Sequence, residues 1–75
     1  MKKAVEVEMR DHELATYLRE KGWTGPEKGT VHYKTEGSSR CASMMKGGNG
    51  ENLAYILYDN ATCTRRVWVF TEDTK

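Results

Sequence analysis

The stretch LAYILYDNATCTRRVWVF, residues 53–70, is the most apolar part of the chain and decides its fold. Two apolar runs, residues 53–58 and 67–70, flank a polar segment. A strand with one solvated face alternates apolar and polar residues, and neither run alternates. Both faces of these strands therefore favour burial, and something must cover the second face.

The whole chain has 75 residues, which is enough for one small domain. A domain of this size buries only about 60% of the surface of its unfolded chain, so its stability is marginal without a partner or a cross-link. Hydrophobic residues make up 37% and are clustered, which indicates a folded chain rather than a disordered one. We predict a single domain over residues 1–75, with 71–75 as a flexible tail.

The charge balance gives the chain no strong field that would attract nucleic acid or a membrane. Its 12 basic and 11 acidic residues leave a net charge of +1. The opening MKKAVEVEMRDHE lacks the apolar core of a signal peptide, and no stretch reaches the roughly 18 apolar residues of a membrane span. We therefore expect a cytoplasmic protein that does not associate with membranes, in which Cys41 and Cys63 are reduced.

Local patterns predict one helix and about five strands. Residues 11–23, DHELATYLREKGW, carry Leu14 and Leu18 at helical spacing, with Asp11 as N-cap and Gly22 as the stop. Strand patterns occupy residues 3–9, 30–36, both arms of a hairpin around Asn49-Gly50, and 63–70. The predicted fold class is α+β, a mainly antiparallel sheet of about five strands with one helix on one face, in the order β-α-β-β-β-β.

Residues 47–53, GGNGENL, resemble the GxxG loop of KH domains, where a helix and then a strand follow the loop. The resemblance extends to residue 70 and implies a helix over residues 51–60 and a loop that clamps a nucleic-acid backbone. The alternative is a hairpin, because Asn49-Gly50 is a strong turn sequence and residues 55–58 favour a strand. We favour the hairpin, and the assignment of the two sheet faces depends on it.

Turns centred on Asn49-Gly50 and Asn60-Ala61 fix the register of the three C-terminal strands. Across the first turn the predicted pairs are Met45 with Ala54, Ser43 with Ile56, and Cys41 with Tyr58. Across the second turn they are Tyr58 with Cys63, Ile56 with Arg65, and Ala54 with Val67. Residues that lie directly opposite each other share a face of the sheet.

The register gives the two faces different compositions. One is small and aliphatic, which suits a core under the helix: Cys41, Ser43, Met45, Ala54, Ile56, Tyr58, Cys63, Arg65, Val67 and Val69. The other is aromatic with arginines at its margin: Arg40, Ala42, Met44, Leu53, Tyr55, Leu57, Thr64, Arg66, Trp68 and Phe70. One helix covers only one face, so we expect the aromatic face to meet a partner or to close on itself.

The side chains that could act in catalysis or bind a metal do not form a recognisable site. His12, His32, Cys41 and Cys63 lack the short ligand spacing of a zinc site, and nothing selects a thiol–imidazole pair in a cleft. The register separates Cys41 from Cys63 by about 9–10 Å, beyond the roughly 7 Å limit for Cα atoms of a disulfide. We predict no catalytic residue, no metal, no cofactor and no disulfide.

The leading hypothesis is a non-enzymatic protein-binding module, either a homodimer or a small inhibitor or adaptor of a larger protein, of the kind found in phages and mobile elements. The predicted partner-binding residues are Tyr55, Leu57, Arg66, Trp68, Phe70 and Met44. The alternative is a single-stranded nucleic-acid-binding module that stacks bases on the same face. Its predicted phosphate-binding residues are Lys34, Arg40, Arg65 and Arg66, and the neutral overall charge argues against it.

Overall fold

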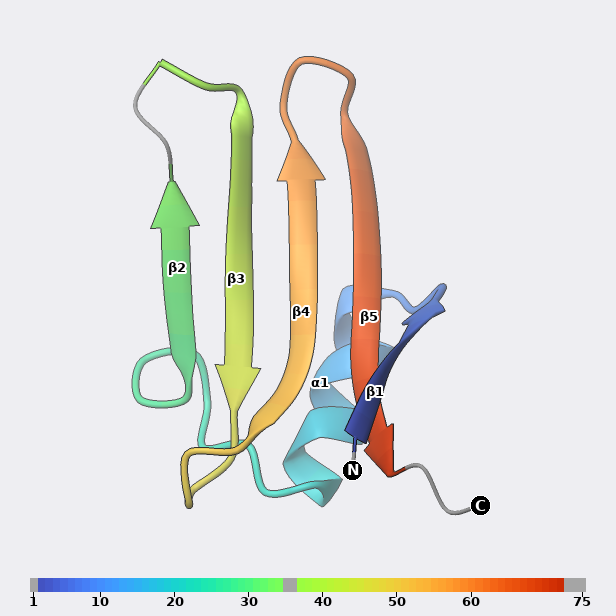
Figure 1. Cartoon of the computed structure of the whole chain (residues 1–75), viewed down its shortest axis with the longest axis vertical. Helices are drawn as coiled ribbons and strands as arrows, with labels where there is room; N and C mark the ends of the chain where they lie inside the picture. The colour runs from blue at the N-terminus through green and yellow to red at the C-terminus, as the bar shows by residue number, and fades with distance from the viewer. Residues whose placement is uncertain (1, 35–36, 73–75) are drawn as a thin grey trace.

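The computed structural model describes residues 2–34 and 37–72 and contains a five-stranded antiparallel sheet with one helix (Figure 1). The elements are β1 (Lys2–Val7), α1 (Asp11–Glu20), β2 (Thr30–Lys34), β3 (Arg40–Lys46), β4 (Asn52–Asp59) and β5 (Thr64–Glu72). Their order across the sheet is β1-β5-β4-β3-β2. The predicted α+β class and the predicted order of elements along the chain are confirmed.

Helix α1 begins one residue earlier than the sequence suggested. Its N-cap is Arg10 rather than Asp11, and the Glu13 carboxylate accepts a hydrogen bond from the Arg10 backbone N–H at 2.9 Å. Asp11 is the first helical residue, and its carboxylate is bound by an arginine side chain from β5 instead. At the other end Gly22 has a positive φ of 104°, and the following N–H of Trp23 reaches back to Leu18 O, as expected for a glycine stop.

The hairpin of β3 and β4 has the predicted register. Cys41 lies opposite Tyr58, Ser43 opposite Ile56, and Met45 opposite Ala54. Residues 52–59 are a strand, so the helix that the KH resemblance implies over residues 51–60 is wrong. The turn is wider than a two-residue one, because the Gly47 N–H donates to Glu51 O, but the strand pairs beyond it are unaffected.

A β-bulge at the base of this hairpin corrects the placement of Leu53. Met45 pairs with Ala54, but the next residue, Lys46, pairs with Asn52, so the register shifts and Leu53 has no direct partner. Leu53 is only 4% exposed and belongs to the core under the helix, not to the aromatic face. The alternation rule fails here because a bulge places two successive side chains on one face.

The register of β4 with β5 differs from the predicted one by two residues. Tyr58 lies opposite Arg65 rather than Cys63, Ile56 opposite Val67, and Ala54 opposite Val69. The connecting loop holds four residues, 60–63, with Cys63 in the left-handed region at φ 55°. The Asp59 carboxylate accepts the Ala61 N–H and stabilises this wider loop. A shift of two keeps each side chain on its predicted face.

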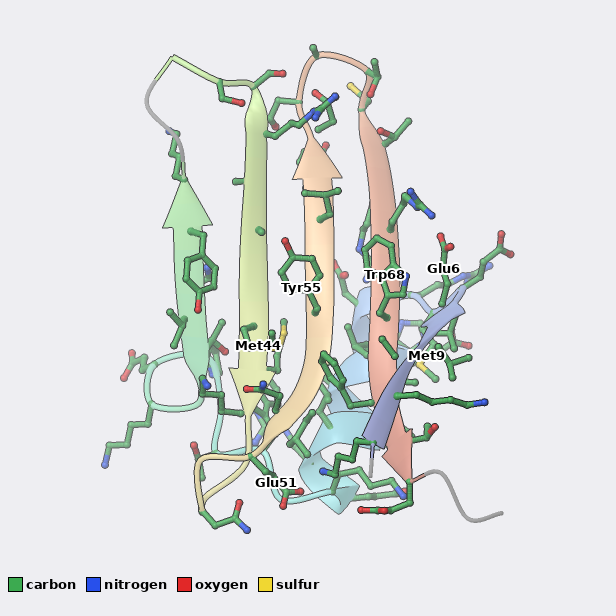
Figure 2. The ribbon with its side chains drawn as sticks, viewed as in Figure 1. Glu6, Met9, Met44, Glu51, Tyr55 and Trp68 are labelled. Carbon is green, nitrogen blue, oxygen red and sulfur yellow. The ribbon has the colours of Figure 1, made fainter. Side chains whose placement is uncertain are left out.

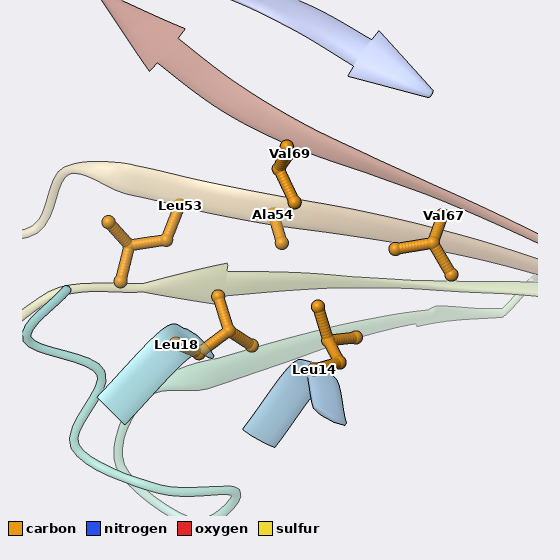
Figure 3. Packing of buried hydrophobic residues seen from close by; sticks show 6 residues of the cluster. All are labelled: Leu14, Leu18, Leu53, Ala54, Val67 and Val69. Carbon is orange, nitrogen blue, oxygen red and sulfur yellow. The ribbon is translucent and has the colours of Figure 1, made fainter. Parts of the chain in front are cut away.

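The hydrophobic core lies between α1 and one side of β4 and β5, which we call the covered face (Figure 3). Its six members are at most 4% exposed: Leu14, Leu18, Leu53, Ala54, Val67 and Val69. Ala54 is fully buried, and its small side chain leaves room for the helix above the sheet (Figure 3). The predicted helix stripe and the predicted small aliphatic face therefore meet each other.

The sheet has two edge strands, β1 and β2. Strand β1 pairs antiparallel with β5 and crosses it obliquely (Figure 1). The pairing extends to Lys2 opposite Glu72, so residues 71 and 72 belong to a strand rather than to the predicted tail. Residues 73–75 of that tail lie outside the described residues, and so do residues 35–36 of the strand predicted over residues 30–36.

Candidate functional site

The side of the sheet opposite α1 is the candidate functional surface, and we call it the open face. The register assigns it residues from all five strands: Ala4, Glu6, Val31, Tyr33, Arg40, Ala42, Met44, Tyr55, Leu57, Asp59, Thr64, Arg66, Trp68 and Phe70. Tyr55, Trp68 and Met44 stand on the side turned away from the helix (Figure 2). Within residues 2–34 and 37–72 the only helix lies behind the sheet, so no helix covers this face.

An apolar row runs across the middle of the open face. Val31 lies opposite Met44, Met44 opposite Tyr55, and Tyr55 opposite Trp68. The rings of Tyr55 and Trp68 are tilted by 45° with centroids 5.8 Å apart, a favourable aromatic contact. These aromatic rings are half-buried by one another, whereas Val31 is 39% and Tyr33 51% exposed. The row is thus a continuous apolar surface that the chain itself leaves partly in contact with water.

Two of the shallow hollows on the open face lie on either side of Tyr55. One, of about 180 Å³, is lined by Ala4, Tyr55, Trp68 and Phe70 and has an apolar wall. The other, of about 210 Å³, lies over β2, β3 and β4 and is lined by Tyr33, Arg40, Cys41, Ala42, Tyr55 and Leu57. Each is too small for a cofactor of typical size, which occupies about 300–1,000 Å³, but each can accept one side chain.

Two ion pairs form the charged margin of the open face. Arg66 donates two hydrogen bonds to the Glu6 carboxylate, both at 2.9 Å, and its guanidinium lies 4.8 Å from the centroid of the Trp68 ring. Arg40 lies 3.5 Å from the Asp59 carboxylate. The hydrogen bonds from Arg66 lower the pKa of Glu6 below its ordinary value. The Ser39 hydroxyl, followed by the Ala61 N–H and Arg40, lowers the pKa of Asp59.

All six predicted partner-binding residues lie on the open face, three of them together in its apolar row. Three further residues, Val31, Tyr33 and Ala4, extend the face to both edges and were not among the predicted ones. For β2 the signal was available, because the short GSSR segment before β3 indicates a further hairpin that pairs Tyr33 with Ala42. For Ala4 there was no local signal, since β1 and β5 lie at opposite ends of the chain.

The four predicted phosphate-binding residues do not come together. Arg40 and Arg66 are on the open face, whereas Lys34 and Arg65 alternate to the other side of the sheet. Arg65 is also engaged within the fold, since it donates to Met9 O at 2.7 Å and to the Asp11 carboxylate at 2.8 Å. The cations therefore form no common track for a nucleic-acid backbone.

The candidate metal ligands are dispersed over the fold. His12 is on α1, His32 on the edge strand β2, Cys41 in β3, and Cys63 in the loop before β5. In the part of the chain that the structure describes, no three His, Cys, Asp or Glu side chains gather where they could hold a metal ion. Both cysteines are free thiols, and Cys63 is in a loop rather than in the predicted strand.

Fold and surface together define a small α+β domain with one covered and one open sheet face. Comparison of the chain with protein-family models, curated proteins and solved structures finds no match. None of the described helices is long and apolar enough to cross a membrane.

Proposed function

We propose that this chain is a non-enzymatic protein-binding module whose open face packs against the open face of a second copy. The observation that carries the proposal is the apolar row from Val31 to Trp68, which spans the sheet without a covering element from the described chain. Its mixture of aromatic side chains, methionine and arginine is typical of the residues enriched in protein interfaces. A second copy would remove this surface from water.

Charge supports a second copy over an unrelated partner. Besides Lys2 and Glu72 at the end of β1 and β5, the open face carries two arginines and two carboxylates, which are arranged as the pairs Arg66–Glu6 and Arg40–Asp59. A two-fold interface brings identical surfaces together, so a face with a single sign of charge would repel itself. This face has no such excess, and its ion pairs can exchange partners across the interface at the rim.

The size of the open face predicts a weak dimer. Five strands spaced about 4.8 Å apart, with about six residues of each strand in contact, give a footprint of about 500 Å² per copy. The resulting total of about 1,000 Å² lies at the lower limit of specific interfaces, below the roughly 1,600 Å² of a standard one. We therefore expect association that depends on protein concentration, with a dissociation constant in the micromolar range.

Sedimentation velocity over a series of concentrations from about 1 μM to about 1 mM tests this proposal. The wild-type chain should shift from monomer to dimer, and Trp68→Ser should weaken the association at least tenfold, because aromatic residues at the centre of an interface dominate its affinity. The matched control is His12→Ala on the exposed side of α1, which should leave the association unchanged.

Fluorescence supplies a second readout for the same interface. In a Trp23→Phe background the remaining indole is Trp68, and its quenching by acrylamide should fall as the dimer forms. A chain that stays monomeric over the whole series, with Trp68 equally quenched throughout, would overturn the second copy as occupant. Binding of a labelled oligonucleotide by that monomer would favour the nucleic-acid alternative, and its absence an inhibitor or adaptor of a different protein.

A further inference from the structure

The outer edge of β2 presents a strand without a partner among the described elements. Strand β2 is last in the order of the sheet, and four of its five residues are exposed. Among the described residues three large hydrophobic side chains are at least 37% exposed, and two of them, Val31 and Tyr33, lie on this strand. Edge strands that remain solitary are usually protected by prolines, bulges or charges, and residues 30–34 contain only one charge, Lys34, at the strand end.

The opposite edge shows the usual protection. Strand β1 carries Lys2, Lys3 and Glu6 among its six residues and crosses β5 obliquely (Figure 1). Lys2 pairs with Glu51 at 3.2 Å and Glu6 with Arg66, so these charges are held in place at the edge. The contrast indicates that the two edge strands have different roles. Strand β1 terminates the sheet, whereas the outer edge of β2 is available for pairing.

We propose that β2 pairs antiparallel with β2 of a second copy and thereby joins two sheets into one continuous sheet. The backbone geometry selects the residues that would form the new pairs. The Lys46 N–H donates to Gly29 O at 2.7 Å, so Gly29 turns its carbonyl toward β3, while its N–H donates to Gly25 O in the preceding loop. Because this orientation alternates along an antiparallel strand, Val31 and Tyr33 also bond inward, and Thr30, His32 and Lys34 turn their N–H and C=O groups outward.

One register uses all of these outward groups. A two-fold axis through His32, perpendicular to the sheet, places His32 opposite His32 of the second copy and Thr30 opposite Lys34 at both ends. Each of these pairs can exchange two backbone hydrogen bonds. The same register sets Val31 beside Tyr33 of the second copy, so the exposed side chains of this edge cover each other. No two lysines face one another, since Lys34 lies opposite a threonine.

This edge interface is independent of the face interface proposed above. Its axis is perpendicular to the sheet, whereas an axis that brings two open faces together lies parallel to them. Edge pairing leaves Trp68 and Tyr55 uncovered and extends the apolar row of the open face into a second molecule. The two contacts can therefore be tested separately, and the failure of one does not decide the other.

Disulfide trapping in the full chain tests the register. In a Cys41→Ser, Cys63→Ser background, His32→Cys places two thiols directly opposite each other, with Cα atoms about 5.5 Å apart and within disulfide range. Lys34→Cys is the matched control on the same strand and face. In the proposed register its two copies are about 13 Å apart along the strands, too far for a bond.

Under mild oxidation His32→Cys should give at least tenfold more covalent dimer than Lys34→Cys, as measured by non-reducing electrophoresis. Adding Trp68→Ser should not change that ratio, because the open face is not part of this contact. Equal dimer yields from the two cysteine variants would overturn the edge pairing. So would a yield from His32→Cys that disappears with Trp68→Ser, since the trapping would then report the face interface instead.

Discussion

The two faces of this sheet are built from alternate residues of the same strands, yet they differ in how far their side chains are buried. On the covered face Ala54, Val67 and Val69 are at most 4% exposed beneath α1. On the open face their neighbours Tyr55 and Trp68 are larger but remain half-exposed. Small side chains occupy the side where the helix backbone must come close, and large aromatic ones the side where nothing from the described chain approaches.

The difference shows how a short chain divides two tasks between two sides of one sheet. A single ten-residue helix shields one face only, so the stability of the monomer depends mainly on that face. The open face adds contacts among its own rings, and its remaining apolar surface is available for association. Substitutions on the two faces should therefore separate stability from binding.

Leu18→Ala should have the largest effect on stability. Leu18 is 1% exposed and packs into the covered-face core, so its truncation removes buried contacts and leaves a cavity (Figure 3). Such truncations cost about 2–5 kcal/mol of unfolding free energy, comparable with the total of about 3–5 kcal/mol expected for a domain this small. Urea unfolding followed by circular dichroism should show a chain that is largely unfolded without denaturant.

The matched variant on the other side is Leu57→Ala. Leu57 is only half-buried, so in dilute solution, where the chain is monomeric, its truncation should cost less than that of Leu18, about 1 kcal/mol. If both leucine variants lost similar unfolding free energy, the open face would be part of the folding core, and the division between the two faces would be wrong.

Enlarging a small side chain should also distinguish the two faces, with an effect on unfolding free energy smaller than that of Leu18→Ala. Ala54 is fully buried under α1, and Ala54→Leu overfills that space, which typically costs about 1–3 kcal/mol. Ala42, on the open face of the neighbouring strand β3, lines the 210 Å³ hollow, and Ala42→Leu should change the unfolding free energy by no more than about 0.5 kcal/mol. Urea midpoints of the two variants provide the measurement. Equal destabilisation by both would contradict the assignment.

Side-chain alternation was sufficient to predict most of these two faces. The pairing of Ser43 with Ile56 follows from the Asn49-Gly50 turn, and the pattern of residues 67–70 assigns Trp68 and Val69 to opposite sides. Even the β4–β5 register, which is off by two residues, leaves the faces intact because side chains repeat with a period of two. The open-face residues of β3, β4 and β5 were therefore predictable one by one, with Leu53 as the exception.

Features that depend on distant or backbone-level interactions were not predictable. The bulge beside Met45 turns Leu53 into the core that contains Leu18, and side-chain alternation does not predict such a bulge. The wider loop before β5 needs Cys63 at positive φ, a conformation that cysteine does not signal. The pairing of β1 with β5 joins the two ends of the chain, and local patterns carry no information about such partners.

The smallest expected effect concerns the charged margin of the open face. The hydrogen bonds from Arg66 favour the ionised form of Glu6 and lower its pKa in the folded chain. A lowered folded-state pKa contributes stability above the ordinary pKa of the carboxyl, and that contribution is lost as the pH falls through the lowered value. Both side chains are exposed and screened by solvent, so the pair contributes little to stability at neutral pH.

Arg66→Gln should therefore raise the pKa of Glu6 toward its ordinary value. The unfolding free energy should then fall less steeply with decreasing pH in the acid range, and it should change little at neutral pH. Carboxyl carbon chemical shifts followed by NMR through the acid range measure the pKa directly. Arg40→Gln is the matched control, because Arg40 pairs with Asp59 and should leave Glu6 unchanged. A Glu6 pKa that is the same in the wild-type chain and in Arg66→Gln would show that the pair does not persist in solution. The arginine would then be free to bind a partner at the edge of the apolar row.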